Sequence, residues 1–128
     1  MAKMLVIDDD PIITQMCKAY FTAKGHTVTV ALDGKEGLEK YKKGIFDIVI
    51  TDLMMPTVHG FRVIDEIKLS SRGDKTAVIL LSADKDEPNL KNYKRKKFQD
   101  DTINKPFDIP VLERMVAKLL EEFADQSK

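Results

Sequence analysis

Five polar residues stand at the ends of short apolar runs, where they could act together: Asp8, Asp9, Asp52, Ser82 and Lys105. Two carboxylates about 4 Å apart repel each other by roughly 4 kcal/mol at an effective dielectric near 20. A hard divalent cation relieves that repulsion, and Mg²⁺ typically binds one or two carboxylates beside a phosphate. A hydroxyl and an ammonium group are suited to phosphoryl oxygens. The residue types therefore predict a magnesium-dependent phosphoryl site.

The elements that would position these residues alternate along the chain. Three apolar runs predict buried strands: Met4–Ile7, Ile48–Ile50 and Ala77–Leu81. A further strand is expected at Thr27–Ala31, which alternates polar and apolar residues as an edge strand should. A fifth strand is expected at Asp101–Asn104, mainly from its place in the series. Helical patterns lie between and after the strands: 11–24, 34–43, 61–69, 88–97 and 108–123.

This order predicts five βα units, an α/β fold in which a parallel sheet has helices on both faces. In such open sheets ligands bind at the carboxyl ends of the strands. The five polar residues are therefore expected to meet at one edge.

Composition limits the alternatives. A chain of 128 residues, 43% hydrophobic and 33% charged, fits one globular domain, expected at 1–123 with a frayed tail at 124–128. Lys and Arg total 21 and so do Asp and Glu, so net charge gives no reason to expect direct binding to nucleic acid or membranes. The single cysteine, Cys17, excludes an internal disulfide. Without a secretory signal or a membrane-spanning run, we expect a cytoplasmic protein.

Four motifs occur in order, each at an expected strand end: Leu-Val-Ile-Asp8-Asp9, Asp52-Leu-Met-Met-Pro56 with Gly60, Leu-Ser82-Ala83, and Lys105-Pro106-Phe107. With them the chain, from about Lys3 to Phe123, resembles the receiver domain of the response regulators in two-component signalling. The resemblance implies a flavodoxin-like (βα)5 doubly wound sheet with strand order 2-1-3-4-5.

The resemblance also implies roles for individual residues. Asp52 would accept a phosphoryl group from a histidine kinase or phosphotransfer protein. Asp9, Asp52 and the backbone carbonyl of Met54 would hold Mg²⁺ or Mn²⁺, with Asp8 acting through a water. Ser82 and Lys105 would contact the phosphoryl group, and the Lys105–Pro106 bond would be cis.

The implied output is a switch rather than classical enzyme turnover, because the domain would only catalyse its own phosphorylation and dephosphorylation. Ser82 would move and bias the face formed by the fourth helix, fifth strand and fifth helix toward a partner protein, as a monomer or a phosphorylation-dependent dimer. Thr102 replaces the aromatic residue usual in the fifth strand, so the aromatic side chain of the usual switching relay is absent. Met54 and Asp84 occupy positions that tune phosphoryl lifetime in the family.

Several other interpretations remain open. Asp10 before Pro11 fits a helix cap, which could also explain part of the acidic run. Asp8-Asp9-Asp10-Pro-Ile12 partly resembles the nucleophile motif of haloacid-dehalogenase-type phosphatases, in which Asp8 would be the nucleophile and Asp10 the general acid. A flavodoxin-like electron carrier would share the fold, and a receiver that has lost phosphorylation would act only by binding. The basic stretch 91–97 is either a solvated face or a docking patch for an acidic partner.

Overall fold

A computed structural model describes residues 1–56, 58–83 and 99–126. Its elements are β1 (Lys3–Ile7), α1 (Pro11–Ala23), β2 (Thr27–Ala31), α2 (Gly34–Lys43), β3 (Ile48–Asp52), α3 (Gly60–Lys68), a short 3-10 helix η1 (Gly73–Lys75), β4 (Ala77–Ala83), β5 (Asp101–Lys105) and α5 (Ile109–Gln126). The helix expected at 88–97, its basic stretch and Asp84 lie outside the described residues.

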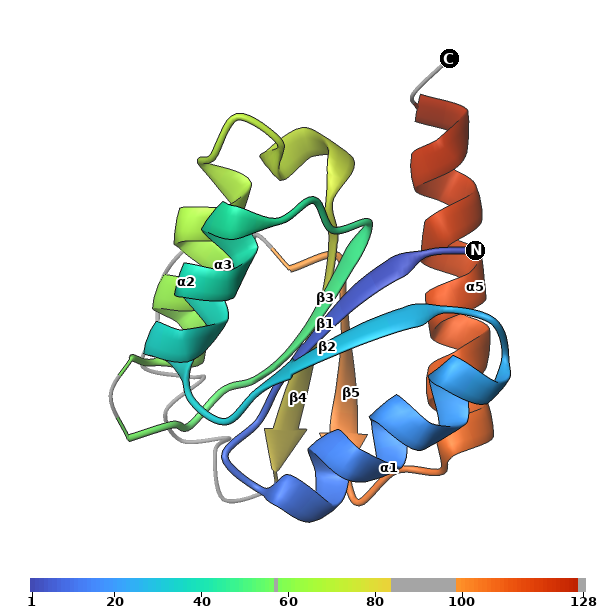
Figure 1. Ribbon diagram of the computed structural model, residues 1–128, viewed down its shortest axis with the longest axis horizontal. Coiled ribbons are helices and arrows are strands. Elements are labelled where there is room, and N and C mark those ends of the chain that lie inside the picture. The colour runs from blue at the N-terminus through green and yellow to red at the C-terminus, as the bar shows by residue number, and fades with distance from the viewer. Residues whose placement is uncertain (57, 84–98, 127–128) are drawn as a thin grey trace.

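The five strands form one parallel sheet in the order β2-β1-β3-β4-β5, as predicted. Helices α2 and α3 cover one face and α1 and α5 the other (Figure 1). The register brings the strand ends level, pairing Ile7 with Thr51 and Asp52 with Leu81. The last residues of β1, β3 and β4 therefore meet at the same edge.

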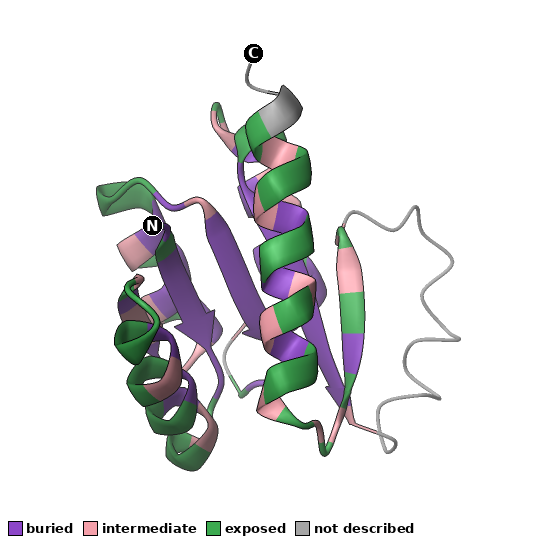
Figure 2. Ribbon diagram, turned by 90° about the vertical axis from the view of Figure 1, so that its right-hand side faces the viewer, coloured by how far each residue is buried: buried purple, intermediate pink, exposed green. Residues whose placement is uncertain are grey.

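Two apolar layers hold the helices to the sheet. One lies under α1 and α5 and includes Cys17, Phe21 and Leu112. The other lies under α2 and α3 and includes Leu38, Ile64 and Ile67. The central strands are buried on both faces, which explains their unbroken apolar runs (Figure 2).

Side-chain caps fix where the helices begin. Asp10 precedes Pro11 and its Oδ1 accepts a hydrogen bond from the backbone N–H of Ile12 at 2.9 Å, which confirms the predicted cap of α1. Asp33 caps α2 by accepting from the N–H of Glu36 at 2.7 Å, while the carboxylate of Glu36 accepts from the N–H of Leu32 at 2.7 Å. This reciprocal pair is a capping box.

The outer edge of the sheet at β2 is partly covered by α2. Lys40 donates from Nζ to the backbone carbonyl of Val30 at 2.6 Å and also lies 3.5 Å from Glu36 Oε2. β2 is an edge strand with two half-exposed residues, as its alternating sequence predicted.

At the other end of the chain, α5 extends through Gln126. The helix thus continues three residues beyond Phe123, at which the domain was predicted to end. That domain boundary and the frayed tail stay predictions.

Candidate functional site

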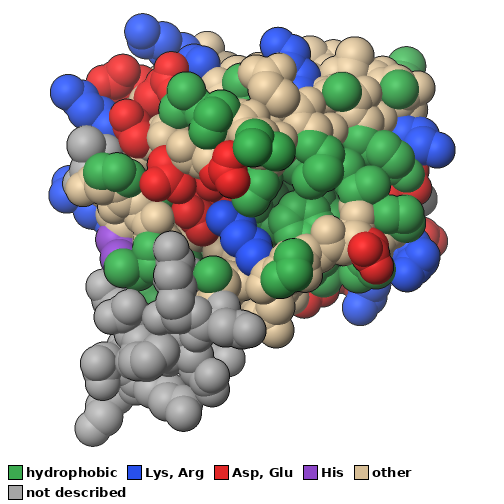
Figure 3. All heavy atoms as spheres, turned by 90° about the horizontal axis from the view of Figure 1, so that it is seen from below, with side chains coloured by type: hydrophobic (Ala, Val, Ile, Leu, Met, Phe, Trp, Pro, Cys, Tyr) green, Lys and Arg blue, Asp and Glu red, His purple; other side chains and the backbone are tan. Residues whose placement is uncertain are grey.

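Three carboxylates gather at the carboxyl edge of the sheet. Asp8, Asp9 and Asp52 each present an oxygen, and these atoms lie within 4.8 Å of one another. Asp8 is fully buried, Asp52 is 4% exposed, and Asp9 faces solvent. β1 and β3 are neighbours in the sheet, so residues 44 positions apart in the sequence become adjacent. Seen from this edge, acidic side chains lie on one side of a basic one and an apolar surface lies on its other side (Figure 3).

Lys105 lies between two of these carboxylates. Its Nζ is 2.8 Å from Asp8 Oδ2 and 3.1 Å from Asp52 Oδ1. Lys105 ends β5, and the Lys105–Pro106 peptide bond is cis, as expected. The other oxygen of Asp8 accepts a hydrogen bond from the backbone N–H of Asp10 at 2.9 Å. The helix-capping loop and the lysine together fix the orientation of Asp8.

The crowding changes the proton affinity of the site. Burial and then the charge of Asp8 raise the pKa of Asp52 to about 6, against the lowering effect of Lys105. Burial likewise raises the pKa of Asp8. Burial alone would lower the pKa of Lys105, but the carboxylates of Asp8 and Asp52 outweigh it and raise that pKa. One ammonium thus neutralises only part of the local negative charge.

This donor set fits a divalent cation. Three carboxylate oxygens within 4.8 Å are the hard ligands that Mg²⁺ and Mn²⁺ bind, and the exposed Asp9 leaves a path from solvent. Met54, whose carbonyl was predicted as a further ligand, follows Asp52 by two residues in the loop after β3. Its part in binding metal stays a prediction.

The predicted switch residues lie on neighbouring strands. Ser82 is 2% exposed near the end of β4 and pairs with Asn104 of β5. Thr102 is exposed in β5, where it pairs with Leu80. The modulating position Asp84 lies outside the described residues. The structure therefore places Ser82 on β4, beside the strand that ends in Asp52. Thr102 is instead exposed on β5.

Gly60 has a structural role that the motif alone did not explain. A Cβ at this position would lie 2.3 Å from the backbone oxygen of Asp52 and 2.7 Å from Cα of Leu53. The N–H of Gly60 donates to the carbonyl of Leu53 at 2.7 Å. The start of α3 therefore packs directly on the backbone that carries Asp52. His59 caps this helix, accepting from the N–H of Phe61 at 3.2 Å.

An apolar hollow of about 410 Å³ adjoins the site and was not predicted from the sequence. Its lining residues come from α1, the end of β4 and the start of the β5–α5 connection: Ile13, Met16, Ala83, Lys105, Pro106 and Phe107. Ile12, on the exposed side of α1, leaves 76% of its surface in solvent.

Comparisons with known proteins decide the family. Residues 4–117 match the family described as "Response regulator receiver domain". The chain belongs to this family. Among curated proteins, this receiver domain is 33% identical over 120 residues to the response regulator RR06 of Streptococcus pneumoniae, covering 94% of this chain and 54% of that protein. It is 31% identical to the transcriptional activator protein PfeR of Pseudomonas aeruginosa, covering 92% of this chain and 37% of that protein.

Solved structures agree with the sequence matches. A response regulator receiver domain protein from Clostridium thermocellum has a TM-score of 0.83 and 30% identity, covering 95% of this chain and 96% of that one. The response regulator TrrA from Thermotoga maritima, in complex with Mg²⁺-BeF, has a TM-score of 0.78 and 31% identity, covering 93% and 99%. The flavodoxin-like fold with order 2-1-3-4-5 is thus confirmed.

These findings favour the receiver interpretation over the phosphatase interpretation. The receiver domain is a signalling domain of two-component systems, and nothing in the comparisons supports a haloacid-dehalogenase-type phosphatase. It spans only about half or less of the length of the curated relatives it matches. Among the described residues, no helix combines the length and apolarity needed to cross a membrane.

Proposed function

We propose that this receiver domain accepts a phosphoryl group on Asp52 from the phosphohistidine of a histidine kinase or phosphotransfer protein. The observation that carries the proposal is the position of the Asp52 carboxylate, 3.1 Å from Lys105 Nζ and within 4.8 Å of oxygens from Asp8 and Asp9. A carboxylate placed beside a cation and two further acids is suited to phosphoryl transfer.

In this reaction an oxygen of Asp52 forms a bond to phosphorus while the phosphorus–nitrogen bond of the donor breaks. The donor imidazole keeps the electron pair of that bond and takes up a proton. Asp52 must be ionised to attack. Lys105 and Ser82 then hold the phosphoryl oxygens, the lysine by charge and the serine by its hydroxyl. Asp8 keeps Lys105 in place throughout.

A bound Mg²⁺ or Mn²⁺ would neutralise charge on the phosphoryl oxygens. Asp9 and Asp52 would hold it directly, with the carbonyl of Met54, and Asp8 would act through a water. The Mg²⁺-BeF complex of TrrA supports the proposal by showing such a ligand on a similar protein. With these groups the domain would catalyse its own phosphorylation and dephosphorylation.

Two surfaces would contact partners. The apolar hollow beside Lys105 would receive the phosphodonor protein, because it lies next to the reacting carboxylate. The face that includes β5 and α5 would signal to a downstream protein, and the helix expected at 88–97 would complete it. We expect the protein to act in the cytoplasm, as a monomer or a phosphorylation-dependent dimer, without binding nucleic acid through this domain. Some relatives are transcriptional regulators, so other domains could supply that function.

Ser82 and Thr102 would transmit the phosphorylation signal. Ser82 would move toward the phosphoryl group, and the exposed Thr102 on β5 would carry the change to the surface without a large side-chain rearrangement. Met54 and Asp84 would modulate the lifetime of the phosphorylated state.

Acetyl phosphate labelling tests the phosphoacceptor. In the presence of Mg²⁺, intact-mass measurement is expected to show one added phosphoryl group on the native chain and none on Asp52→Asn. The Asp74→Asn variant is the matched control, because Asp74 is exposed in η1 and lies outside the site. Labelling of Asp52→Asn together with its loss in Asp8→Asn would instead support the phosphatase mechanism and refute the proposal.

A further inference from the structure

A second cavity lies at the amino edge of the sheet, opposite the phosphoryl site. It has a volume of about 370 Å³, and its lining residues come from the N-terminus, the loops before β2, β3 and β4, and the end of α5: Met1, Ala2, His26, Asp47, Lys75, Leu120, Phe123 and Ala124. We call it the amino-edge cavity. Phosphoryl transfer uses none of these residues.

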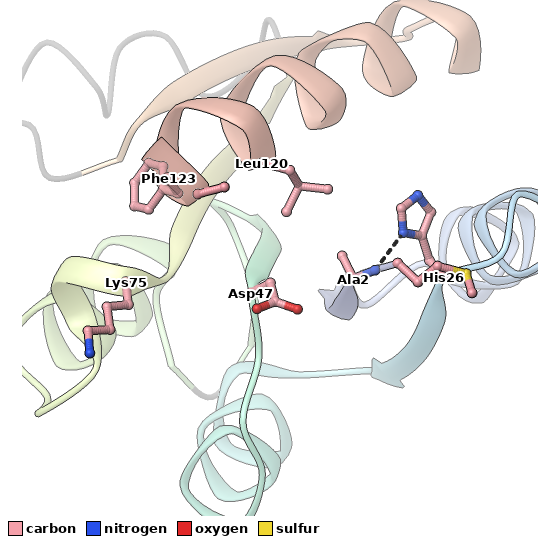
Figure 4. Close-up of a pocket in the computed structure, with 8 residues that line it drawn as sticks. Ala2, His26, Asp47, Lys75, Leu120 and Phe123 are labelled. Carbon is pink, nitrogen blue, oxygen red and sulfur yellow. Dashed lines mark hydrogen bonds between the residues drawn. The ribbon is translucent and has the colours of Figure 1, made fainter. Parts of the chain in front are cut away.

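The carboxylate of Asp47 is the central polar group of the amino-edge cavity. In Figure 4 it lies between Leu120 and Phe123 on one side and Ala2 and His26 on another. Its Oδ2 accepts a hydrogen bond from the backbone N–H of Lys3 at 2.8 Å. Its Oδ1 receives no hydrogen bond from the part of the chain that the structure describes, so it can accept one from a ligand.

The side chains of His26, Lys75 and Lys3 leave the carboxylate available. The Nδ1 of His26 accepts a hydrogen bond from the N–H of Ala2 at 3.1 Å. Lys75 is exposed and its ammonium points away from Asp47 (Figure 4). The side chain of Lys3 is likewise exposed to water.

The end of α5 supplies the apolar side of the cavity. Leu120, Phe123 and Ala124, near that end, form one wall. The cavity therefore combines a carboxylate with an apolar wall.

We propose that the amino-edge cavity binds a small organic cation in which a planar cationic group, such as an amidinium or guanidinium, is attached to an apolar frame. The planar head pairs with the carboxylate of Asp47, whose geometry such groups match. The frame lies against Leu120 and the side of Phe123 that faces the cavity, since the ring of Phe123 also has the ammonium of Lys68 5.0 Å from its centroid. Because α5 supplies this wall, a bound cation stabilises the observed position of the end of α5.

Benzamidine and benzamide form a matched pair of probes, since they share a shape and differ in charge. Each is titrated into the full chain at saturating Mg²⁺ while the amide resonances are followed by heteronuclear NMR. Benzamidine is expected to shift the resonances of Asp47, His26 and the last turns of α5, and to bind about tenfold more tightly than benzamide, equivalent to about 1.4 kcal/mol.

Two variants locate the interaction. Asp47→Asn keeps an acceptor for the N–H of Lys3 and should lose the preference for benzamidine. Glu39→Gln removes the same charge from an exposed position on α2, which lines no part of the cavity, and should keep it. Equal binding of the two probes, an unchanged preference in Asp47→Asn, or shifts confined to the residues around Asp52 would overturn the proposal.

Discussion

Gly60 shows how a single residue without a side chain can determine the position of the phosphoacceptor. The backbone of α3 approaches the Asp52 carbonyl so closely that a Cβ would lie 2.3 Å from it. The atoms nearest to that Cβ, the backbone oxygen of Asp52 and Cα of Leu53, both belong to the backbone rather than to a flexible side chain. A methyl group here must therefore displace either the start of α3 or the backbone at the end of β3.

We expect Gly60→Ala to lower both stability and phosphorylation. Overpacking of this kind typically costs about 1–3 kcal/mol, and a displaced Asp52 would react more slowly with acetyl phosphate. Urea unfolding and intact-mass labelling measure the two effects. Gly44→Ala is the control, because the backbone atom closest to its Cβ lies 3.6 Å away and its close contacts are with the ring of Phe46. Normal labelling of Gly60→Ala would show that α3 does not position Asp52.

At the scale of single elements, α2 depends on its capping box. Asp33 and Glu36 each accept a backbone hydrogen bond at 2.7 Å across the first turn. The last turn contains Lys40, Lys42 and Lys43, which complement the helix dipole at that end. α2 therefore has stabilising groups at both termini despite its two glycines, Gly34 at its start and Gly37 inside it.

Asp33→Ala is expected to reduce the free energy of unfolding by about 1 kcal/mol, since the N–H of Glu36 loses its acceptor. Asp33→Asn keeps an acceptor and should reduce it much less. Thermal and urea unfolding measure both variants. Equal losses in the two would mean that the charge of Asp33, rather than its hydrogen bond, stabilises the helix.

Lys68 connects several elements at the amino edge of the sheet. From the end of α3 its Nζ lies 2.7 Å from Asp100 Oδ2, donates to the carbonyl of Thr76 at 2.6 Å, and lies 5.0 Å from the ring centroid of Phe123. The same oxygen of Asp100 accepts from the N–H of Val78 at 2.7 Å. One ammonium thus links α3 to the segments that begin β4 and β5 and to α5.

Lys68→Met should destabilise the fold by about 1–3 kcal/mol, because it leaves the partly buried Asp100 without its cation. Lys35→Met, at an exposed position of α2, should change stability by less than about 0.5 kcal/mol. Urea unfolding compares the two variants. A similar small effect of both would show that the Lys68 contacts contribute little net stability.

The elements also show what a sequence can and cannot predict. The limits of the strand Thr27–Ala31 were predicted correctly, because the alternation of polar and apolar residues is a local signal. The strand at Asp101–Asn104 was predicted from the repeating order of elements. The acidic cluster and Lys105 could be predicted because strand ends converge in a parallel sheet. The contact of Gly60 with Asp52 depends on distances between segments that no local pattern records. The same is true of the Lys68 network and the cavity around Asp47.

At the scale of the whole molecule, the acidic site couples folding to pH. Asp52 has a pKa of about 6 in the folded chain and an ordinary value of 3.8, so between these values the folded state binds more protons than the unfolded state. The stability contributed by this group therefore decreases as pH rises through that window. The decrease is complete above the folded pKa.

Without metal, we expect the free energy of unfolding of the native chain to decrease between about pH 5 and about pH 7.5. Asp52→Asn lacks this titration, so its free energy of unfolding should decrease less over the same range. Adding Mg²⁺ should stabilise the native chain more at the higher pH, since the ion binds ionised carboxylates. Thermal unfolding with EDTA or Mg²⁺ measures both effects. A magnesium effect that is independent of pH, or equal in Asp52→Asn, would place the ion elsewhere.

The cover that α2 gives to β2 has a consequence for the protein in a crowded solution. With Lys40 occupying the outward carbonyl of Val30, a foreign strand meets a charged side chain instead of a free acceptor. Intermolecular strand addition, the first step toward fibres, is therefore discouraged at this flank. Aggregation resistance is thus built into the same helix that helps to close the hydrophobic interior.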